Sequence, residues 1–310
     1  MIDIKTLNGT AASPFAFGTM QFGGTADETA SAEMFDASRA AGINHFDTAY
    51  LYTEGRSETI LGALVKPLRD ELIIATKVAY DEQGDPTKLQ TDFDVSRKRL
   101  GMECVDILYL HRHVGKDLPR AIEWMAEQQS QGTLRYIGLS NFAAWQVMDA
   151  VGLAKSHGTR IDIIQPMYNL VKRQAEVEIL PMCMDQGITC APYSPLGGGL
   201  LTGKYGQGAS GRIATDTRYN QRYSLAYMHE TAAALSALAH EQNIHPATLA
   251  AAWVAHHSFA PVPLLSARSV QQLQPSLDAI TFEMDDALYQ KIAALSPTPP
   301  PATDRWEERV

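Results

Sequence analysis

The sequence contains few of the features that mark secreted, membrane-bound or nucleic-acid-binding proteins. Its 310 residues include only three cysteines and no CxxC pair, so we expect free thiols, without a disulfide framework or a cysteine-ligated metal. No apolar run reaches the ~18 residues that a membrane-spanning helix needs, and no basic-then-apolar leader opens the chain. The formal net charge of -9 disfavours a broad nucleic-acid-binding surface, because such surfaces need lysine and arginine. These absences predict a cytoplasmic protein that binds neither membranes nor nucleic acids.

Short apolar and β-branched runs alternate with amphipathic segments along most of the chain. Most of the runs begin about thirty residues after the previous one, the length of a strand, a crossover helix and two loops. The predicted strands are 15–22, 43–48, 72–77, 105–111, 134–140, 161–167, 188–193 and 263–267. The predicted helices are 29–41, 92–100, 118–131, 229–242 and 246–257, and the first three stop at a glycine.

This alternation predicts an α/β fold, a (β/α)8 TIM barrel. We expect a single domain over residues 1–310, in which residues 296–310, rich in proline and charge, form an extended tail. The interval before the last strand is too long for one crossover and contains a glycine-rich stretch at 197–211. Long loops in compact domains are usually functional or disordered. We therefore expect long loops over the C-terminal face of the barrel, where active sites of such barrels lie.

Polar residues end three consecutive predicted strands at that face. Asp47, Lys77 and His111 end the second, third and fourth strands, and Tyr52 lies in the loop after Asp47. Taken singly, each residue could be structural: a cap, a solvated strand end or a packed ring. Four such residues converging on one rim indicate a site, in which Asp47 is the expected partner of a buried Lys77 ammonium.

Proton delivery is the chemistry that this set suggests. A free phenol titrates near ~10, which is too high for an efficient acid or base at neutral pH. An adjacent ammonium favours the phenolate and so lowers that value. His111 can donate to, or help polarise, a carbonyl oxygen. The set suits hydride addition to C=O, which places transient negative charge on oxygen.

The order Phe46-Asp47-Thr48-Ala49 with Tyr52, then Lys77, then His111, resembles the catalytic tetrad of the aldo-keto reductases. Segments 138–142, 165–169, 193–196 and 267–269 also resemble segments of that family, so the likeness covers nearly the whole chain. Segments 52–58 and 199–205 are most similar to the aflatoxin-aldehyde and succinic-semialdehyde reductase branch. The resemblance implies NADPH-dependent reduction of aldehydes or ketones to alcohols, with Tyr52 as the proton donor.

The resemblance also implies which residues bind the cofactor. Ser140, Asn141 and Gln165 would bind the nicotinamide carboxamide, and Tyr193 would stack beneath the ring. Arg268 would meet the 2′-phosphate of NADP, because a guanidinium fork matches phosphate geometry, so we expect NADPH rather than NADH. The remaining expected cofactor contacts are Ser194, Leu196, Gly199, Leu200, Lys204, Ser266 and Gln272.

Two departures from the family pattern affect the expected pocket. Arg112-His113-Val114 follows the catalytic histidine where many members have Trp-Pro or Met-Pro, and Pro275-Ser276 replaces the usual Glu-Asn pair near the adenine. The substrate and adenine contacts should therefore differ from those of many members. The candidate substrate contacts are Arg112, His113, Arg222 and Trp306. The carbonyl substrate is expected to be a small molecule of open identity, and the protein is expected to be a monomer or a dimer.

Three alternative functions stay open at this point. His111 and His113 form an HxH pattern that some barrel metallohydrolases use for zinc, although the later strand ends offer no further histidine or aspartate. Lys77 could instead be the Schiff-base lysine of an aldolase. A nicotinamide-binding regulatory subunit, similar to the potassium-channel β subunits, would share the same fold. We expect no metal.

Overall fold

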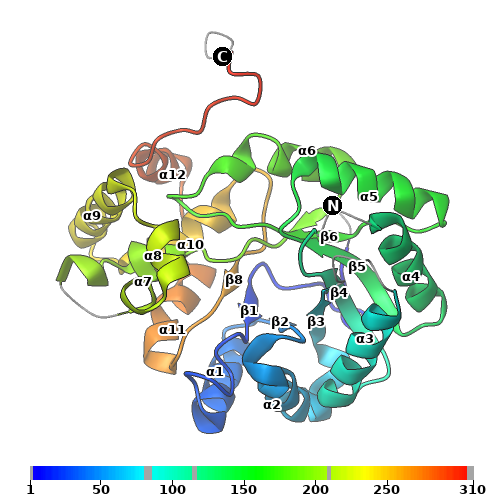
Figure 1. The fold of residues 1–310 in the computed structure, drawn as a ribbon. Coiled ribbons are helices and arrows are strands. Elements are labelled where there is room, and N and C mark those ends of the chain that lie inside the picture. Colours follow the sequence, from blue (N-terminus) through cyan, green and yellow to red (C-terminus); the bar gives the residue numbers. More distant parts are fainter. Residues whose placement is uncertain (1–2, 80–85, 114–116, 208–210, 306–310) are drawn as a thin grey trace.

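Eight parallel strands form the centre of the fold in the computed structural model, which describes residues 3–79, 86–113, 117–207 and 211–305 (Figure 1). The N–H groups of Val262 and Leu264 donate to the carbonyls of Cys190 and Pro192 at 2.8 and 2.9 Å, which joins the eighth strand to the seventh. The predicted (β/α)8 barrel is therefore confirmed. The sheet order is β7-β6-β5-β4-β3-β2-β1-β8. The strands are β1 (Ala16–Gly18), β2 (His45–Asp47), β3 (Ile73–Val78), β4 (Val105–Leu110), β5 (Leu134–Ser140), β6 (Ile163–Gln165), β7 (Thr189–Cys190) and β8 (Leu264–Leu265).

Helices surround the strands (Figure 1). Each of the five predicted helical segments overlaps an observed helix, and most of their ends agree to within a few residues. The exception is the start of α3, which begins earlier than predicted. The helices are α1 (Glu28–Ala40), α2 (Arg56–Val65), α3 (Pro86–Leu100), α4 (Leu118–Ser130), α5 (Ala144–Ser156), α6 (Ile179–Gln186), α7 (Arg212–Thr215), α8 (Thr217–Arg222), α9 (Ala226–Glu241), α10 (Pro246–His256), α11 (Val270–Leu277) and α12 (Asp286–Ala293).

Most of the strands are shorter than predicted, and two of the differences from the predicted elements have clear local reasons. The strand expected at 15–22 is limited to β1, because the chain turns where the Phe22 N–H donates to the Thr19 carbonyl at 2.9 Å. The loop expected before β8 contains helix α8, because the Asp216 side chain caps its first turn by accepting from the N–H groups of Arg218 and Tyr219.

The N-terminal segment packs against one end of the barrel interior. Ile4 is buried and belongs to the same apolar cluster as the inward-facing Ala16, Ile73 and Ile107. The Arg135 guanidinium holds this segment in place by donating to the Lys5 carbonyl at 2.8 Å. The N-terminal end of the barrel is thus filled by apolar side chains, whereas the C-terminal ends of the strands carry the polar residues described below.

The last helix is followed by a segment without regular structure. Residues 297–305 form neither helix nor strand, and Figure 1 shows them leading away from the barrel. The predicted division into one domain and a tail at 296–310 stays a prediction. Within the described part of the chain, no helix is both long and apolar enough to cross a membrane.

Candidate active site

A buried ion pair joins the C-terminal ends of β2 and β3. The Lys77 ammonium contacts a carboxylate oxygen of Asp47, and their side chains are 0% and 2% exposed. Lys77 Nζ also donates to the Thr48 carbonyl at 2.8 Å, and Gln165 Nε2 donates to the second Asp47 oxygen at 2.9 Å. The pair is therefore held by two more hydrogen bonds, one to the end of β2 and one from the end of β6, which offsets part of the cost of burying both charges.

Burial shifts the protonation equilibria of the two partners in opposite directions. It raises the pKa of Asp47 and lowers the pKa of Lys77, and the attraction between the two charges opposes both shifts. Each charge is thus maintained by the other. Removing either partner would leave an uncompensated charge inside the barrel.

Tyr52 and His111 lie beside this ion pair. Lys77 Nζ is 5.1 Å from the centroid of the Tyr52 ring, and the Tyr52 and His111 rings meet edge to face at 5.8 Å between centroids. Burial lowers the pKa of His111 to about 3, and the positive charges of Lys77 and Arg112 act in the same direction. The imidazole is therefore neutral at physiological pH, and the structure brings together the four residues predicted from the strand ends.

The loop that carries Tyr52 has an unusual backbone. Thr53, Glu54 and Gly55 have φ values of 47°, 58° and 89°, three consecutive residues in the left-handed region. The Tyr52 N–H donates to the Ala49 carbonyl at 3.0 Å, which fixes the turn just before them. This conformation costs free energy at Thr53 and Glu54, so the surroundings must hold it in place.

A chain of hydrogen bonds connects the predicted nicotinamide contacts. The Tyr193 hydroxyl donates to Asn141 Oδ1 at 2.7 Å, and Asn141 Nδ2 donates to the His111 carbonyl at 2.9 Å. The Ser140 hydroxyl donates to the Gln165 carbonyl at 3.1 Å. These four predicted residues therefore lie next to one another and to the loop after β4, at the same rim as Tyr52.

Lys204, a cation beside the glycine-rich turn that follows β7, lies within electrostatic range of a second cation, Arg268. Burial lowers the pKa of Lys204, and the Arg268 guanidinium acts in the same direction, so the two positive charges are close. Among the described residues, neither forms an ion pair with a carboxylate. The turn approaches Lys204 closely, because a Cβ added at Gly199 (φ +92°) would lie 3.0 Å from Lys204 Nζ. A pair of cations without an acidic partner, beside an open glycine backbone, fits the phosphates of a dinucleotide.

The other predicted cofactor residues lie in the loops after β7 and β8. The backbone of Ser194 is left-handed (φ 60°), and its carbonyl accepts from Asn169 Nδ2 at 2.9 Å. Leu200 is buried, whereas Ser266 and Gln272 are exposed, the latter in the first turn of α11. The remaining residue of the set, Leu196, is half-buried at the start of the glycine-rich turn.

His113 contacts the loop after β5 and the first turn of α5. Its ring contacts Phe142 and Trp145 at 5.2 and 6.1 Å between centroids, and its Nδ1 lies 3.1 Å from Gln146 Nε2. The neighbours of His113 recorded in the structure therefore differ from those of His111, an arrangement that does not favour a zinc ion shared by both imidazoles. In the described ranges, no group of three or more His, Cys, Asp or Glu side chains could hold a metal.

The remaining predicted substrate contacts are only partly placed by the structure. Arg112 is exposed, next to His111. The Arg222 guanidinium stacks over the Tyr219 ring at 5.0 Å. Burial raises the pKa of Tyr193 to about 12 while the Arg222 charge opposes this rise, so Arg222 lies close enough to Tyr193 to affect the rim of the site. Trp306 lies outside the described residues.

Two further residues were not predicted, one beside Lys77 and one beside the candidate substrate contact Arg222. The buried Tyr109 ring lies 5.7 Å from Lys77 Nζ, and Lys172 lies near Arg222, whose charge helps to lower the pKa of Lys172 after the larger effect of burial. Strand alternation could have indicated Tyr109, because it precedes His111 by two positions and so points to the same side of β4. No sequence signal places Lys172.

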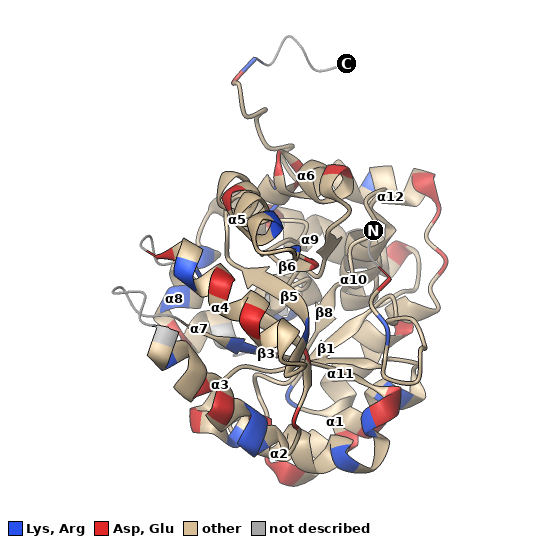
Figure 2. Cartoon of the chain, turned by 90° about the vertical axis from the view of Figure 1, so that its right-hand side faces the viewer, with Lys and Arg blue, Asp and Glu red and all other residues tan. Residues whose placement is uncertain are grey.

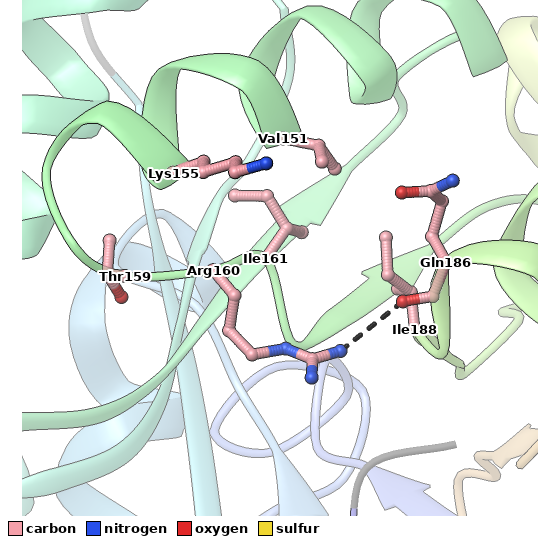
Figure 3. Close-up of a pocket in the computed structure, with 7 residues that line it drawn as sticks. All are labelled: Val151, Lys155, Thr159, Arg160, Ile161, Gln186 and Ile188. Carbon is pink, nitrogen blue, oxygen red and sulfur yellow. Dashed lines mark hydrogen bonds between the residues drawn. The ribbon is translucent and has the colours of Figure 1, made fainter.

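Two surface hollows lie outside the tetrad. One, of about 170 Å³, is at the N-terminal ends of β6 and β7, where Arg160 donates to backbone carbonyls near Gln186 (Figure 3). The other, of about 360 Å³, lies beside the loop after β1 and is lined by residues that include Asp27 and Arg56. Neither is lined by a tetrad residue, so neither hollow is the site described above.

Comparison with known proteins assigns the chain to a family. The Aldo/keto reductase family matches residues 14–297. The chain is 31% identical over 314 residues to the uncharacterized oxidoreductase YrpG of Bacillus subtilis, covering 94% of each chain. It is 32% identical to the human aflatoxin B1 aldehyde reductase member 2 (84% of this chain, 80% of the relative) and 30% identical to a probable voltage-gated potassium channel subunit beta of Arabidopsis thaliana (88% and 89%). The chain therefore belongs to the aldo/keto reductase family and is an oxidoreductase of that family.

Proposed function

We propose that this oxidoreductase reduces small aldehydes or ketones to alcohols with NADPH, and that Tyr52 supplies the proton. The observation that carries the proposal is the buried Lys77–Asp47 pair beneath Tyr52, with the Lys77 ammonium 5.1 Å from the centroid of the phenol ring. The hydride for the carbonyl carbon would come from NADPH when it is bound. Tyr52 gives its proton to the carbonyl oxygen, where the reaction places negative charge.

The other tetrad members assist this proton transfer. The Lys77 ammonium stabilises the phenolate that remains on Tyr52, and Asp47 keeps the ammonium charged inside the barrel. The neutral His111 donates a hydrogen bond to the carbonyl oxygen and orients it. Because the pKa of His111 is about 3, the imidazole is not a proton source at neutral pH. These roles leave Tyr52 as the acid.

NADPH is the proposed cofactor because of the charges at the rim. Lys204 and Arg268 offer two cations to phosphate groups, and the fork of Arg268 suits the 2′-phosphate that distinguishes NADPH from NADH. Ser140, Asn141 and Gln165 would position the nicotinamide, and Tyr193 would support the ring.

The reducing cytoplasm is the proposed compartment, since the three cysteines are free.

A titration and an aldehyde panel test this proposal. Tryptophan quenching should show tighter binding of NADPH than of NADH, and aldehydes added afterwards should oxidise NADPH. Arg268→Ala should weaken NADPH about tenfold or more, with little effect on NADH, because a charge-assisted bond to the 2′-phosphate is lost. The matched control, Arg120→Ala on the exposed side of α4, should change neither affinity.

The outcomes separate the alternatives. An equal loss of NADPH and NADH affinity in Arg268→Ala contradicts the 2′-phosphate role. Tight NADPH binding without turnover of any aldehyde would favour the regulatory alternative, which the similarity to the potassium channel subunit beta keeps in view.

A further inference from the structure

A fully buried carboxylate lies behind the proposed acid, in the first turn of α2. The Glu58 side chain is 0% exposed and pairs with Arg99 Nη1 of α3 at 3.1 Å. Its other oxygen accepts from the Thr76 hydroxyl at 2.7 Å. Thr76 directly precedes Lys77 in β3, so this carboxylate ties α3 to the strand that carries the tetrad lysine.

The Arg99 guanidinium contacts the Tyr52 loop both before and after Tyr52 in the sequence. Its Nη1 donates to the Tyr50 carbonyl at 3.1 Å, and its carbon lies 4.7 Å from the centroid of the Tyr50 ring. A Cβ at Gly55 would lie only 2.3 Å from Arg99 Cζ, so the Gly55 backbone rests directly on the guanidinium. The residues before and after Tyr52 therefore pack against the same side chain, that of Arg99.

This support matters because the loop is not in a relaxed conformation. Thr53 and Glu54, the two non-glycine residues of the left-handed segment after Tyr52, persist in this conformation only where neighbouring groups hold them. The Tyr50 N–H also donates to the Lys77 carbonyl at 3.0 Å, which links the same segment to β3. Movement of Arg99 would thus be transmitted both to the Tyr52 loop and to the strand of Lys77.

We propose that the Glu58–Arg99 ion pair positions Tyr52 against Lys77 for proton delivery. Both are positioning residues, since they act through the loop and β3 rather than on a substrate. Only the expected effect on kcat and its pH dependence rests on the proposed reductase function. The loop geometry is independent of which substrate is reduced.

Glu58 also contributes to the charge balance around Lys77. Burial lowers the pKa of Lys77, and the carboxylates of Asp47 and, to a smaller extent, Glu58 oppose that shift. Loss of the Glu58 charge should therefore lower the pKa of Lys77 further. The titratable and charged groups that face Lys77 are Asp47 and His45 on β2, Tyr52 in its loop, Glu58 on α2, Tyr109 on β4, and His111 directly after β4.

Glu58→Gln tests the charge while keeping the size of the side chain and an acceptor for Thr76. With NADPH and 4-nitrobenzaldehyde, we expect kcat to fall about tenfold or more, since small misplacements of reacting groups are costly. The basic limb of the kcat–pH profile should move to lower pH, because the ammonium then loses its proton earlier. NADPH affinity should stay unchanged.

Hydrogen exchange gives a readout that needs no turnover. Peptides covering residues 49–57 should exchange faster in Glu58→Gln. They should also do so in Arg99→Lys, whose single ammonium cannot reproduce the guanidinium contacts with Tyr50, Gly55 and Glu58. Arg99 is partly exposed, so this variant keeps the test usable if Glu58→Gln fails to fold.

Asp106→Asn is the matched control. Asp106 is as buried as Glu58 and pairs with Arg69 at 2.7 Å, but near the N-terminal end of β4, away from the tetrad. The Asp106→Asn variant should have a lower free energy of unfolding. It should change neither the hydrogen exchange of residues 49–57 nor the basic limb of the kcat–pH profile. The inference is overturned if both variants leave the exchange of 49–57 unchanged, or if Asp106→Asn alters it equally. A wild type without turnover contradicts the proposed function instead, and the exchange result still decides the positioning role.

Discussion

At the scale of single residues, burial determines which groups around Tyr52 carry charge. The Lys77 and Asp47 side chains are charged only as a pair, whereas His111 is held neutral by burial and nearby cations. A neutral imidazole can donate a hydrogen bond throughout the physiological range. The tetrad thus combines one ion pair, one neutral donor and one phenol, a set suited to supplying a proton without exposing charge to water.

His45, two residues before Asp47 on β2, should make the stability of the protein depend on pH. Burial, together with the Lys77 charge, lowers the pKa of His45 to about 4, against 6.5 for the ordinary side chain. Between these values the unfolded chain binds a proton that the folded protein does not, so stability falls as pH drops from 6.5 toward 4. Urea unfolding at pH 7 and pH 5 should show that the wild type loses about 2 kcal/mol more than His45→Gln.

Other groups contribute to the same curve but do not change this difference. The pKa of Asp162 is raised to about 6 by burial, so that carboxyl stabilises the fold as pH falls through 6 and offsets part of the loss in both proteins. If His45→Gln loses as much stability as the wild type between pH 7 and pH 5, the buried neutral histidine is not responsible.

At the scale of elements, close packing between β4 and β5 holds the Tyr109 ring in place beside Lys77. The Tyr109 ring is fully buried, and a Cβ at Gly138 would lie 2.5 Å from its Cδ1 atom. Gly138→Ala should therefore displace Tyr109 from beneath Lys77 and destabilise the protein by about 1–3 kcal/mol in urea unfolding.

Gly152 in α5 provides the matched substitution. A Cβ at that position meets nothing within 4 Å, and the residue lies in the middle of an exposed helix face. Gly152→Ala should therefore stabilise the protein by up to about 1 kcal/mol, since alanine favours helix over glycine. Equal effects of the two substitutions would contradict the packing argument at Gly138.

The elements show how far the sequence alone could lead. The spacing of apolar runs predicts the eight strands, and polar strand ends bring together Asp47, Lys77 and His111 because parallel strands end at one face. The three left-handed residues after Tyr52 have no comparable signal, because only Gly55 is a residue that favours that conformation. Their support by Arg99 comes from α3, far along the chain, and such long-range contacts leave no local pattern.

At the scale of the whole molecule, an acidic protein groups cations that form no ion pair with any carboxylate of the described ranges. The net charge is -9, and Figure 2 shows basic and acidic residues interspersed over the outer helices. Lys204 lies near Arg268, and Lys172 lies near Arg222. This local concentration of positive charge favours an anionic ligand at the C-terminal face, as the proposed NADPH would be.

The barrel also restricts where the reaction can occur. Its N-terminal end is filled by Ile4 and the inward-facing apolar residues, while the four tetrad residues gather at the opposite end. In the proposed reaction, hydride and proton would therefore both reach the carbonyl from this rim. The central claim is that Tyr52 stands at that rim as the acid.

Single-turnover reduction by Tyr52→Phe tests this claim most directly. The variant keeps the ring and its packing against His111 but has no proton to give. With NADPH and aldehyde both saturating, the rate of NADPH oxidation should fall by about 10²–10⁴-fold, while the NADPH dissociation constant measured by tryptophan quenching stays at the wild-type value. A rate within a few-fold of the wild type would contradict the assignment of Tyr52 as the proton donor.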